Sequence, residues 1–345
     1  MDGPLDTPVN ASVDASVDAS VDVSEDAAVY ALPMRTRFRG ITVREGMLWQ
    51  GAAGWGEFCP FSDYDATESL PWWRASVEAA ERGWPAPRRE RVPVNCTVPA
   101  VDPERAAAIA SAPHGCRTAK VKVAEPGQTL AHDVARVEAV RDALGAGGRI
   151  RIDANGGWDV ETAVETLRVL DRAAGGLEYA EQPCATVEEL AAVRRRTDVP
   201  VAADESIRRT DDPYRVAALG AADIAVLKVA PLGGVAACLE IADRIGLPVV
   251  VSSALESSVG LAAGVALAAA LPELPYACGL GTAAMFTRDV TADPLLPVDG
   301  SLPVRRVIPD AVHDVSADAA TARRWAERRE AVRALERSLG QDRRP

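Results

Sequence analysis

The chain has 345 residues and a formal net charge of -12, because 50 acidic residues outnumber 38 lysines and arginines. At about 150 residues per domain, this length predicts two domains, or one large α/β barrel with an appended module. Hydrophobic residues make up 48% of the chain, which is enough for a sizeable core. Nucleic acids and anionic membranes attract a basic face, so the acidic balance excludes both as general partners while leaving room for a local basic pocket.

The first 26 residues carry more than half of that charge, with seven acidic residues and no basic one. Within them the unit Ala-Ser-Val-Asp repeats from Ala11 to Asp22. Such a segment has too little apolar surface to offset its ordering entropy, so we expect a disordered acidic tail over residues 1–26. An interaction tail and a start-site artefact are both open alternatives.

Several features predict a cytoplasmic protein. The N-terminus lacks the basic region and apolar core of a signal peptide, and the longest apolar run, Val259–Leu271, is too short to cross a bilayer. The six cysteines contain no Cys-x-x-Cys pair and only three histidines are present, so we expect reduced thiols and no zinc site.

A regular alternation of strands and helices begins at about residue 92. Between most of the strands lie segments with helical apolar spacing, such as Val160, Val164 and Leu167. This pattern predicts parallel βα units, closed either as an open doubly wound sheet or as a (β/α)8 barrel, and eight units favour the barrel. The eight β-rich runs begin near Val94, Ala119, Arg149, Leu177, Val199, Asp223, Pro248 and Pro275.

The flanking regions differ from the barrel. Residues 35–51 alternate as a hairpin does, a helix follows over Glu68–Glu81, and a second helix over 317–339 carries Trp325, Val332, Leu335 and Leu339 at helical spacing. We therefore predict four parts. These are the tail (1–26), an N-terminal capping domain (27–91), a catalytic barrel (92–304), and a C-terminal segment (305–345) whose helix returns to the capping domain.

Charged residues recur where the predicted strands end, which is where such barrels carry their active sites. Lys120 and Lys122 share one face of the second strand, and burying unpaired charges there would be costly. The third, fourth and fifth strands end in Asp153, Glu181 and Asp204, and the sixth ends in Lys228.

Three carboxylates on adjacent strands repel one another unless a cation lies among them. Their hard oxygen atoms favour Mg²⁺ over zinc. A metal ion flanked by two opposed lysines suits removal of a proton next to a carboxylate, because the metal takes up charge and a neutral lysine takes the proton. Each residue alone also fits a turn, a helix cap or a solvated loop, but the joint pattern strongly favours a site.

The ordered set resembles the enolase superfamily, in its muconate-lactonizing-enzyme-like branch. The motifs that carry the resemblance are Lys120-x-Lys122, Asp153-x-Asn155, Glu181-Gln182-Pro183, Ala203-Asp204-Glu205-Ser206 and Lys228. The resemblance covers about residues 28–310. It implies an enolase-like α/β fold, which is a modified TIM-type barrel, (β/α)7β, with an α+β capping domain.

Longer stretches such as RIDANGGWDVETAV and VVVSSALESSVG are similar to the actinobacterial o-succinylbenzoate synthase family. That similarity implies a lyase of menaquinone biosynthesis, which dehydrates 2-succinyl-6-hydroxy-2,4-cyclohexadiene-1-carboxylate to 2-succinylbenzoate. The cofactor would be Mg²⁺, with Mn²⁺ as a substitute, and the partner a small anionic dicarboxylate substrate. An N-succinylamino acid racemase, alone or combined with the dehydratase, is the alternative, and a dipeptide epimerase is a weaker one. The resemblance leaves open whether the protein is a monomer or a homo-oligomer.

The resemblance also assigns roles. Asp153, Glu181 and Asp204 would bind the metal, Lys122 would be the base and then the acid, and Lys228 would stabilise the enediolate from the other face. Lys120 would hold a metal-bound oxygen and favour the neutral form of Lys122. Arg151 and Asn155 would contact Asp153 from behind or beside the metal, and Glu205 would be a carboxylate just outside the metal ligands. Residues placed against the succinyl group of the substrate would be Ser252, Ser253 and Gly281.

One departure concerns closure of the site. Related racemases cover their site with a mobile loop of the first domain, whereas the segment Thr36–Thr42 between the first two strands is too short for a long lid. The short segment therefore mildly disfavours a racemase that needs a close cover.

Overall fold

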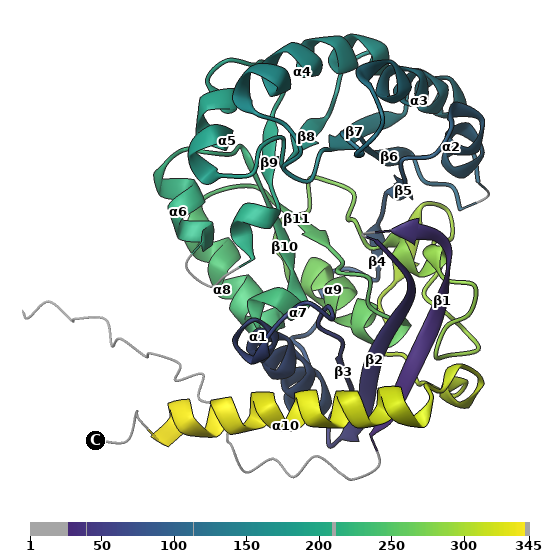
Figure 1. Ribbon diagram of the computed structural model, residues 1–345, viewed down its shortest axis with the longest axis vertical. Helices are drawn as coiled ribbons and strands as arrows, with labels where there is room; N and C mark the ends of the chain where they lie inside the picture. Colours follow the sequence, from purple (N-terminus) through teal and green to yellow (C-terminus); the bar gives the residue numbers. More distant parts are fainter. Residues whose placement is uncertain (1–26, 39, 113, 209–211, 342–345) are drawn as a thin grey trace, which may run out of the picture.

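The computed structural model describes residues 27–38, 40–112, 114–208 and 212–341. The predicted acidic tail and its repeated unit lie outside the described residues. Two modules are visible in Figure 1, a strand-and-helix module at the bottom of the view and a larger ring of helices around strands above it.

The first module begins with three antiparallel strands in chain order. The predicted hairpin is present, and the helix after it begins at Asp65, whose side chain and that of Glu68 form a reciprocal capping box. The elements are β1 (Ala28–Phe38), β2 (Ile41–Gly51), β3 (Gly54–Phe58), α1 (Ala66–Val77) and the short π-helix η1 (Glu78–Arg82).

The second module is built on seven parallel strands that are hydrogen-bonded in chain order. Their bounds are β5 (Cys96–Val98), β6 (Thr118–Lys122), β7 (Arg149–Asp153), β8 (Tyr179–Glu181), β9 (Val201–Ala203), β10 (Ile224–Lys228) and β11 (Val249–Ser252). The predicted eighth strand is reduced to two bridging residues. Cys278 bridges Val94 and Gly279 bridges Ser252, so this segment joins the last strand to the first and closes the ring.

Helices follow the strands and cover the outside of the ring, as Figure 1 shows for α2 to α6 and α8. The helices are α2 (Pro103–Ala110), α3 (Leu130–Leu144), α4 (Val160–Ala174), α5 (Val187–Arg194), α6 (Asp212–Ala218), α7 (Val229–Leu232), α8 (Val235–Ile245) and α9 (Ser258–Ala270). Short 3-10 turns are η2 (Glu205–Ile207), η3 (Gly281–Met285) and η4 (Val312–Val315). The strand–helix alternation predicted from the sequence is therefore observed.

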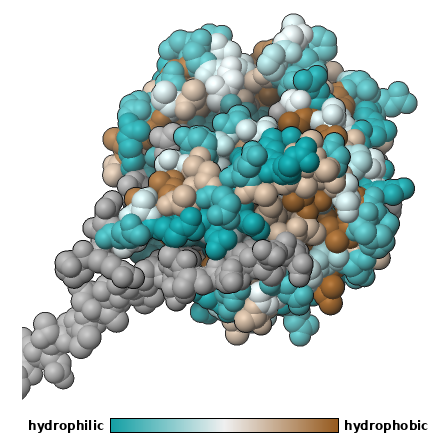
Figure 2. Space-filling model, turned by 60° about the horizontal axis from the view of Figure 1, so that its bottom comes forward, coloured by the Kyte–Doolittle hydropathy of each residue, from teal (hydrophilic) through white to brown (hydrophobic). Residues whose placement is uncertain are grey.

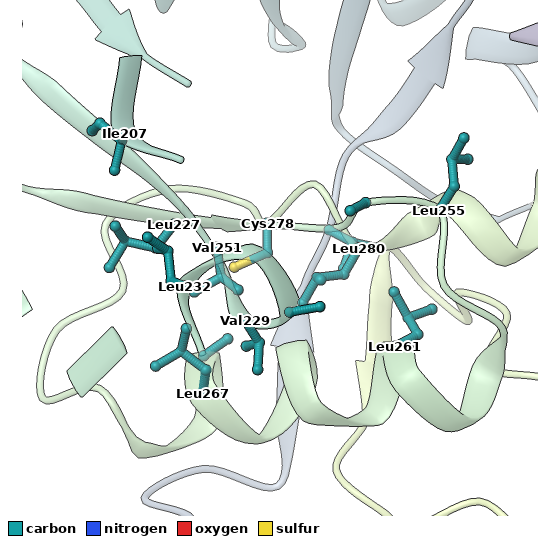
Figure 3. Close-up of a cluster of buried hydrophobic side chains, with 14 of the residues drawn as sticks. Ile207, Leu227, Val229, Leu232, Val251, Leu255, Leu261, Leu267, Cys278 and Leu280 are labelled. Carbon is teal, nitrogen blue, oxygen red and sulfur yellow. The ribbon is translucent and has the colours of Figure 1, made fainter. Parts of the chain in front are cut away.

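The core lies between the strands and these helices. Figure 3 shows Leu227 of β10, Val251 of β11 and Leu267 of α9 within one apolar cluster. Every residue of α9 except Gly260 is buried, which explains why its sequence is apolar on all sides. Among the described residues, no helix has both the length and the hydropathy needed to cross a membrane.

The C-terminal helix α10 (Ala319–Gln341) returns to the first module, as Figure 1 shows at the bottom of the view. Trp325 is 2% exposed and meets the Phe58 ring edge-on, with 5.9 Å between the ring centroids. The Trp73 indole N–H donates to the Glu336 carboxylate over 2.9 Å. We call β1–β3, α1, η1 and α10 the capping module.

A short antiparallel pair, β4 (Arg91–Pro93) with β12 (Ser301–Pro303), joins the segment before the first barrel strand to the segment after the last one. On the face drawn in Figure 2, hydrophilic residues predominate and hydrophobic ones form scattered groups. Leu339 was expected on the buried side of the last helix, but it is 40% exposed, so the apolar stripe that packs ends before it.

Replacing Trp325 by alanine tests this docking. Because the indole is buried against Phe58, the free energy of unfolding should fall by about 3–5 kcal/mol in urea titrations. The matched control on the same helix, Leu339→Ala, removes an exposed side chain and should change it by less than about 0.5 kcal/mol. Equal losses in both variants would contradict the packing described for α10.

Candidate active site

Charged side chains converge where the barrel strands end. Asp153 closes β7, Glu181 closes β8, and Asp204 directly follows β9. The sheet register pairs Lys122 with Asp153 and Asp153 with Glu181, so these side chains lie at one level. The three carboxylates are at most 2% exposed. The convergence expected from spacing alone is thus present in the structure.

The two lysines of β6 bind this cluster directly. The Lys120 ammonium lies 2.7 Å from Glu181 Oε1 and 3.1 Å from Asp153 Oδ2. The Lys122 ammonium lies 2.5 Å from Asp153 Oδ2 and donates to Asn155 Oδ1 over 2.7 Å. Two lysines in an apolar strand are therefore tolerated because each has a carboxylate partner.

Lys228, at the end of β10, reaches the cluster from the other side. Its ammonium lies 2.5 Å from Asp204 Oδ2, and its side chain is 11% exposed. Lys122 and Lys228 both line the same pocket, with the carboxylates of Asp153 and Asp204 between their strands. This arrangement brings two amines to one pocket from strands on either side of the carboxylate cluster.

Burial and neighbouring charge change the proton affinities of the cluster. Burial disfavours the charged form of Asp153, but Lys122 and Lys120 outweigh it and hold the pKa of Asp153 well below its usual range. Lys228 does the same for the pKa of Asp204. Burial, aided by the charges of Asp153 and Asp204, raises the pKa of Glu181 to about 8. Of the three carboxylates, Glu181 is thus the one whose charged form is disfavoured, chiefly by burial.

The carboxylate cluster has features for and against a metal ion. Among the described residues, no three side chains of His, Cys, Asp or Glu already stand as a set of ligands, since lysine ammoniums pair with the carboxylates instead. One observation favours a cation: Asp204 Oδ1 is buried without a hydrogen-bond partner. The donor set of carboxylate oxygens on adjacent strands fits a hard divalent ion.

Two further predicted residues surround Asp153. The Asn155 backbone N–H donates to Asp153 Oδ1 over 3.1 Å, and its side chain donates to Glu205 Oε1 over 3.1 Å. Glu205 in turn pairs with Arg208 at 2.5 Å. Asn155 therefore contacts Asp153 directly, whereas Glu205 contacts Asn155 and Arg208.

Arg151 has different partners from those expected. It is completely buried one layer below Asp153, where it pairs with Glu178 at 2.5 Å and lies 4.6 Å from the centre of the Tyr179 ring. It also donates to the carbonyl of Ala277 over 2.7 Å. The contacts of Arg151 thus lie inside the barrel, where its Nη2 atom is buried without a hydrogen-bond partner among the described residues.

The pocket above the cluster has a volume of about 40 Å³. Two of the three residues expected to bind substrate, Ser252 and Ser253, line it. Gly281 lines a neighbouring cavity of about 270 Å³ instead. The Asn95 backbone approaches it closely, since a Cβ at position 281 would lie 2.9 Å from the Asn95 carbonyl oxygen. These serines and the glycine are therefore not at one surface.

Several residues that line the pocket were not predicted from the sequence. Thr97 could have been found, because the register places it beside Lys120. No sequence pattern indicated Phe38 or Phe61, which reach the pocket from the capping module. The connection between β1 and β2 is short, as expected. Even without a long loop, the capping module reaches the site, because the centre of the Phe38 ring lies 5.3 Å from the Lys122 ammonium. Other lining residues that were missed are Arg208, Ala254, Leu255, Gly279 and Thr282.

Sequence comparisons decide the family. The family described as "Enolase C-terminal domain-like" matches residues 104–311, and "Enolase N-terminal domain-like" matches residues 29–80. A protein of Thermobifida fusca named o-succinylbenzoate synthase is 69% identical over 278 residues, which cover 81% of this chain and 87% of that protein. The chain belongs to the o-succinylbenzoate synthase family.

A second member of the o-succinylbenzoate synthase family, from Mycolicibacterium smegmatis, is 58% identical over 309 residues, covering 89% of this chain and 95% of its own. Among solved structures, the L-Ala-D/L-Glu epimerase of Bacillus subtilis has a TM-score of 0.71 at 23% identity, covering 81% of this chain and 95% of its own. Muconate lactonizing enzyme from Pseudomonas putida has a TM-score of 0.70 at 20% identity, covering 85% of this chain and 98% of its own. These likenesses confirm the enolase-like fold alone.

In this member of the o-succinylbenzoate synthase family, one buried carboxylate lies beside the pocket without joining the cluster. Glu256 follows the lining residues Ala254 and Leu255, is 6% exposed, and accepts the Ala254 N–H over 2.8 Å. Burial, together with the charge of Glu57, raises the pKa of Glu256 to about 7. The unfolded value is about 4.3, so the folded protein binds this proton more tightly.

The stability contributed by Glu256 is therefore present below about pH 4.3 and lost as the pH rises through its folded pKa of about 7. In urea titrations from pH 5 to pH 8, Glu256→Gln should gain about 2 kcal/mol relative to the unchanged protein. The exposed Glu240→Gln serves as the control and should show no such trend. A Glu256→Gln difference that is constant with pH would contradict this assignment.

Proposed function

We propose that the protein is a carbon–oxygen lyase that dehydrates 2-succinyl-6-hydroxy-2,4-cyclohexadiene-1-carboxylate to 2-succinylbenzoate, a step of menaquinone biosynthesis. The observation that carries the proposal is the placement of Lys122 and Lys228 on opposite sides of a buried carboxylate cluster in one pocket. Relatives 55 to 69% identical to the chain carry the name o-succinylbenzoate synthase, which supports this reaction over others of the fold.

Asp153, Glu181 and Asp204 would together hold one Mg²⁺ or Mn²⁺ ion, as their oxygen atoms and the unpartnered Asp204 Oδ1 favour. When bound, the ion supplies positive charge to the substrate carboxylate as its neighbouring carbon loses a proton. In the structure these carboxylates pair with the ammonium groups of Lys120, Lys122 and Lys228.

Lys122 would perform both proton transfers. In its neutral form, the Nζ atom takes the proton from the carbon that bears the carboxylate, and the C–H electron pair moves toward that carboxylate as an enediolate. The resulting ammonium then donates that proton to the departing hydroxyl on the same face, so that the C–O bond breaks, water leaves and the aromatic ring forms. Asn155 Oδ1, 2.7 Å from Nζ, would orient the amine throughout.

Lys228 would remain an ammonium on the opposite face and stabilise the negative charge that accumulates on the substrate. Lys120, two residues before Lys122 on β6, would add a second fixed positive charge. Ser252 and Ser253 would contact the succinyl group, and Gly281 would shape the neighbouring wall. The ammonium groups and the ion would make the pocket cationic, which suits a dianionic dicarboxylate despite the acidic total charge.

The same placement of two lysines supports a second candidate, an N-succinylamino acid racemase. There, one amine would remove the proton from one face and the other would return it to the opposite face. The two reactions make different demands on Lys228, which needs to lose its proton only in the racemase.

Direct assay of the purified protein separates the candidates. With Mg²⁺ present, we expect rapid conversion of the cyclohexadiene carboxylate, monitored by the ultraviolet absorbance of the product, and its loss in EDTA with recovery on adding Mg²⁺. N-succinyl amino acids are assayed in parallel by polarimetry. Turnover of the amino acids without turnover of the cyclohexadiene would overturn the proposal.

Substitution of each lysine by arginine tests the assigned roles. Lys122→Arg removes the base and should lower kcat for dehydration by about 10²- to 10⁴-fold. Lys228→Arg keeps the positive charge, so dehydration should fall by only about tenfold, whereas any racemisation should disappear. Equal losses of dehydration in the two variants would contradict the different roles of the two lysines.

A further inference from the structure

A buried carboxylate of the capping module contacts the barrel. Glu57 of β3 is 6% exposed and accepts backbone N–H groups from Ser257 over 2.9 Å and from Gly260 over 2.8 Å. The Ser257 hydroxyl also donates to it, and the Tyr30 hydroxyl donates over 2.6 Å. All four donors are directed at one side chain, which leaves it fully hydrogen-bonded without a cationic partner among these contacts.

These contacts lie at the start of α9, whose N-cap is Ser257. The first N–H groups of a helix have no partner inside the helix, and the positive end of its dipole favours an anion there. Ser257 caps one of them itself, accepting the N–H of Val259 over 3.2 Å. Glu57 satisfies others from a different module, so the start of α9 is fixed by a residue 200 positions earlier in the chain.

A second residue of the capping module contacts the segment just before α9. Arg44 of β2 is 3% exposed and donates to the Leu255 carbonyl over 3.0 Å. The same guanidinium donates to the Cys59 carbonyl and lies 4.5 Å from the centre of the Phe61 ring. Arg44 thereby connects two pocket-lining residues, Phe61 and Leu255, through a single side chain.

The segment between these two contacts needs such support. Leu255 has a φ of +64°, a left-handed conformation that costs free energy for a side chain with a Cβ. Leu255 and the residues from Ser252 to Ala254 all line the pocket. A strained loop that forms part of a binding surface keeps its shape only where its surroundings hold it.

We infer that Glu57 and Arg44 are positioning residues, which hold the loop Ser252–Ser257 in the shape that recognises the substrate. Neither residue is among those that line the pocket, so both act through the loop. The capping module would then determine substrate recognition from behind the barrel wall as well as through Phe38 and Phe61. This inference rests on the proposed function for its kinetic test but not for its structural one.

The test uses Glu57→Gln, in which an amide N–H₂ group replaces one carboxylate oxygen. That group is itself a donor, so it cannot accept hydrogen bonds from the donors that face Glu57. The control is Glu336→Gln, the same change at a buried carboxylate of the capping module that binds Trp73 and contributes nothing to the pocket. Tyr30→Phe is a milder variant that removes one of the four donors. Each is compared at a temperature well below its Tm.

For Glu57→Gln we expect KM, and the Kd for 2-succinylbenzoate, to rise about tenfold or more while kcat changes less, because a misplaced binding loop weakens recognition. Tyr30→Phe should change KM by less than about threefold, and Glu336→Gln should leave it unchanged within about twofold. Amide hydrogen exchange should accelerate about tenfold in the segment 253–258 of Glu57→Gln only.

Unchanged exchange in that segment would overturn the inference whatever the substrate is. Equal rises of KM in Glu57→Gln and Glu336→Gln would also overturn it, because they would show a general loss of stability. If all variants and the unchanged protein lack dehydratase activity, the proposed function fails, but the exchange measurement still decides the positioning role. Arg44→Lys, which cannot reach both carbonyls, should repeat the Glu57→Gln pattern more weakly.

Discussion

The structure depends on how charge is balanced inside an apolar barrel. Three carboxylates and three ammonium groups share a space that few water molecules can enter, and each is tolerated only because the others are present. Removing any one leaves an uncompensated charge, which is more costly than never having the pair. The same balance holds the amines of Lys122 and Lys228 at one pocket, where they carry the proposed chemistry.

The fold converts short sequence motifs into that balance. Parallel strands in chain order bring residues 23 to 31 positions apart to adjacent places, and the two-residue period of a strand sets which of them face inward. Lys122, Asp153 and Glu181 are neighbours for this reason. The capping module contributes what the barrel lacks, namely aromatic walls from Phe38 and Phe61 and support for the loop after β11.

Sequence reasoning predicted the parts that follow from local periodicity. The strand ends, the six central charges and the returning C-terminal helix depend on spacing along one element or between successive βα units. Arg151 lies two positions before the end of β7, and its partner Glu178 was not predicted because it precedes the next strand in the chain. Phe38 and Arg44 act across modules, and no periodicity along the chain encodes which hairpin residue meets which barrel loop.

The closure of the barrel has a consequence for synthesis on the ribosome. The ring is completed only when Cys278 and Gly279 reach Val94 and Ser252, and β4 finds its partner only at residues 301–303. The capping module is completed later still, because α10, the last helix to be synthesised, packs on elements from the beginning of the chain. Neither module can therefore finish folding while its C-terminal part is still in the exit tunnel, and the early strands must stay soluble until then.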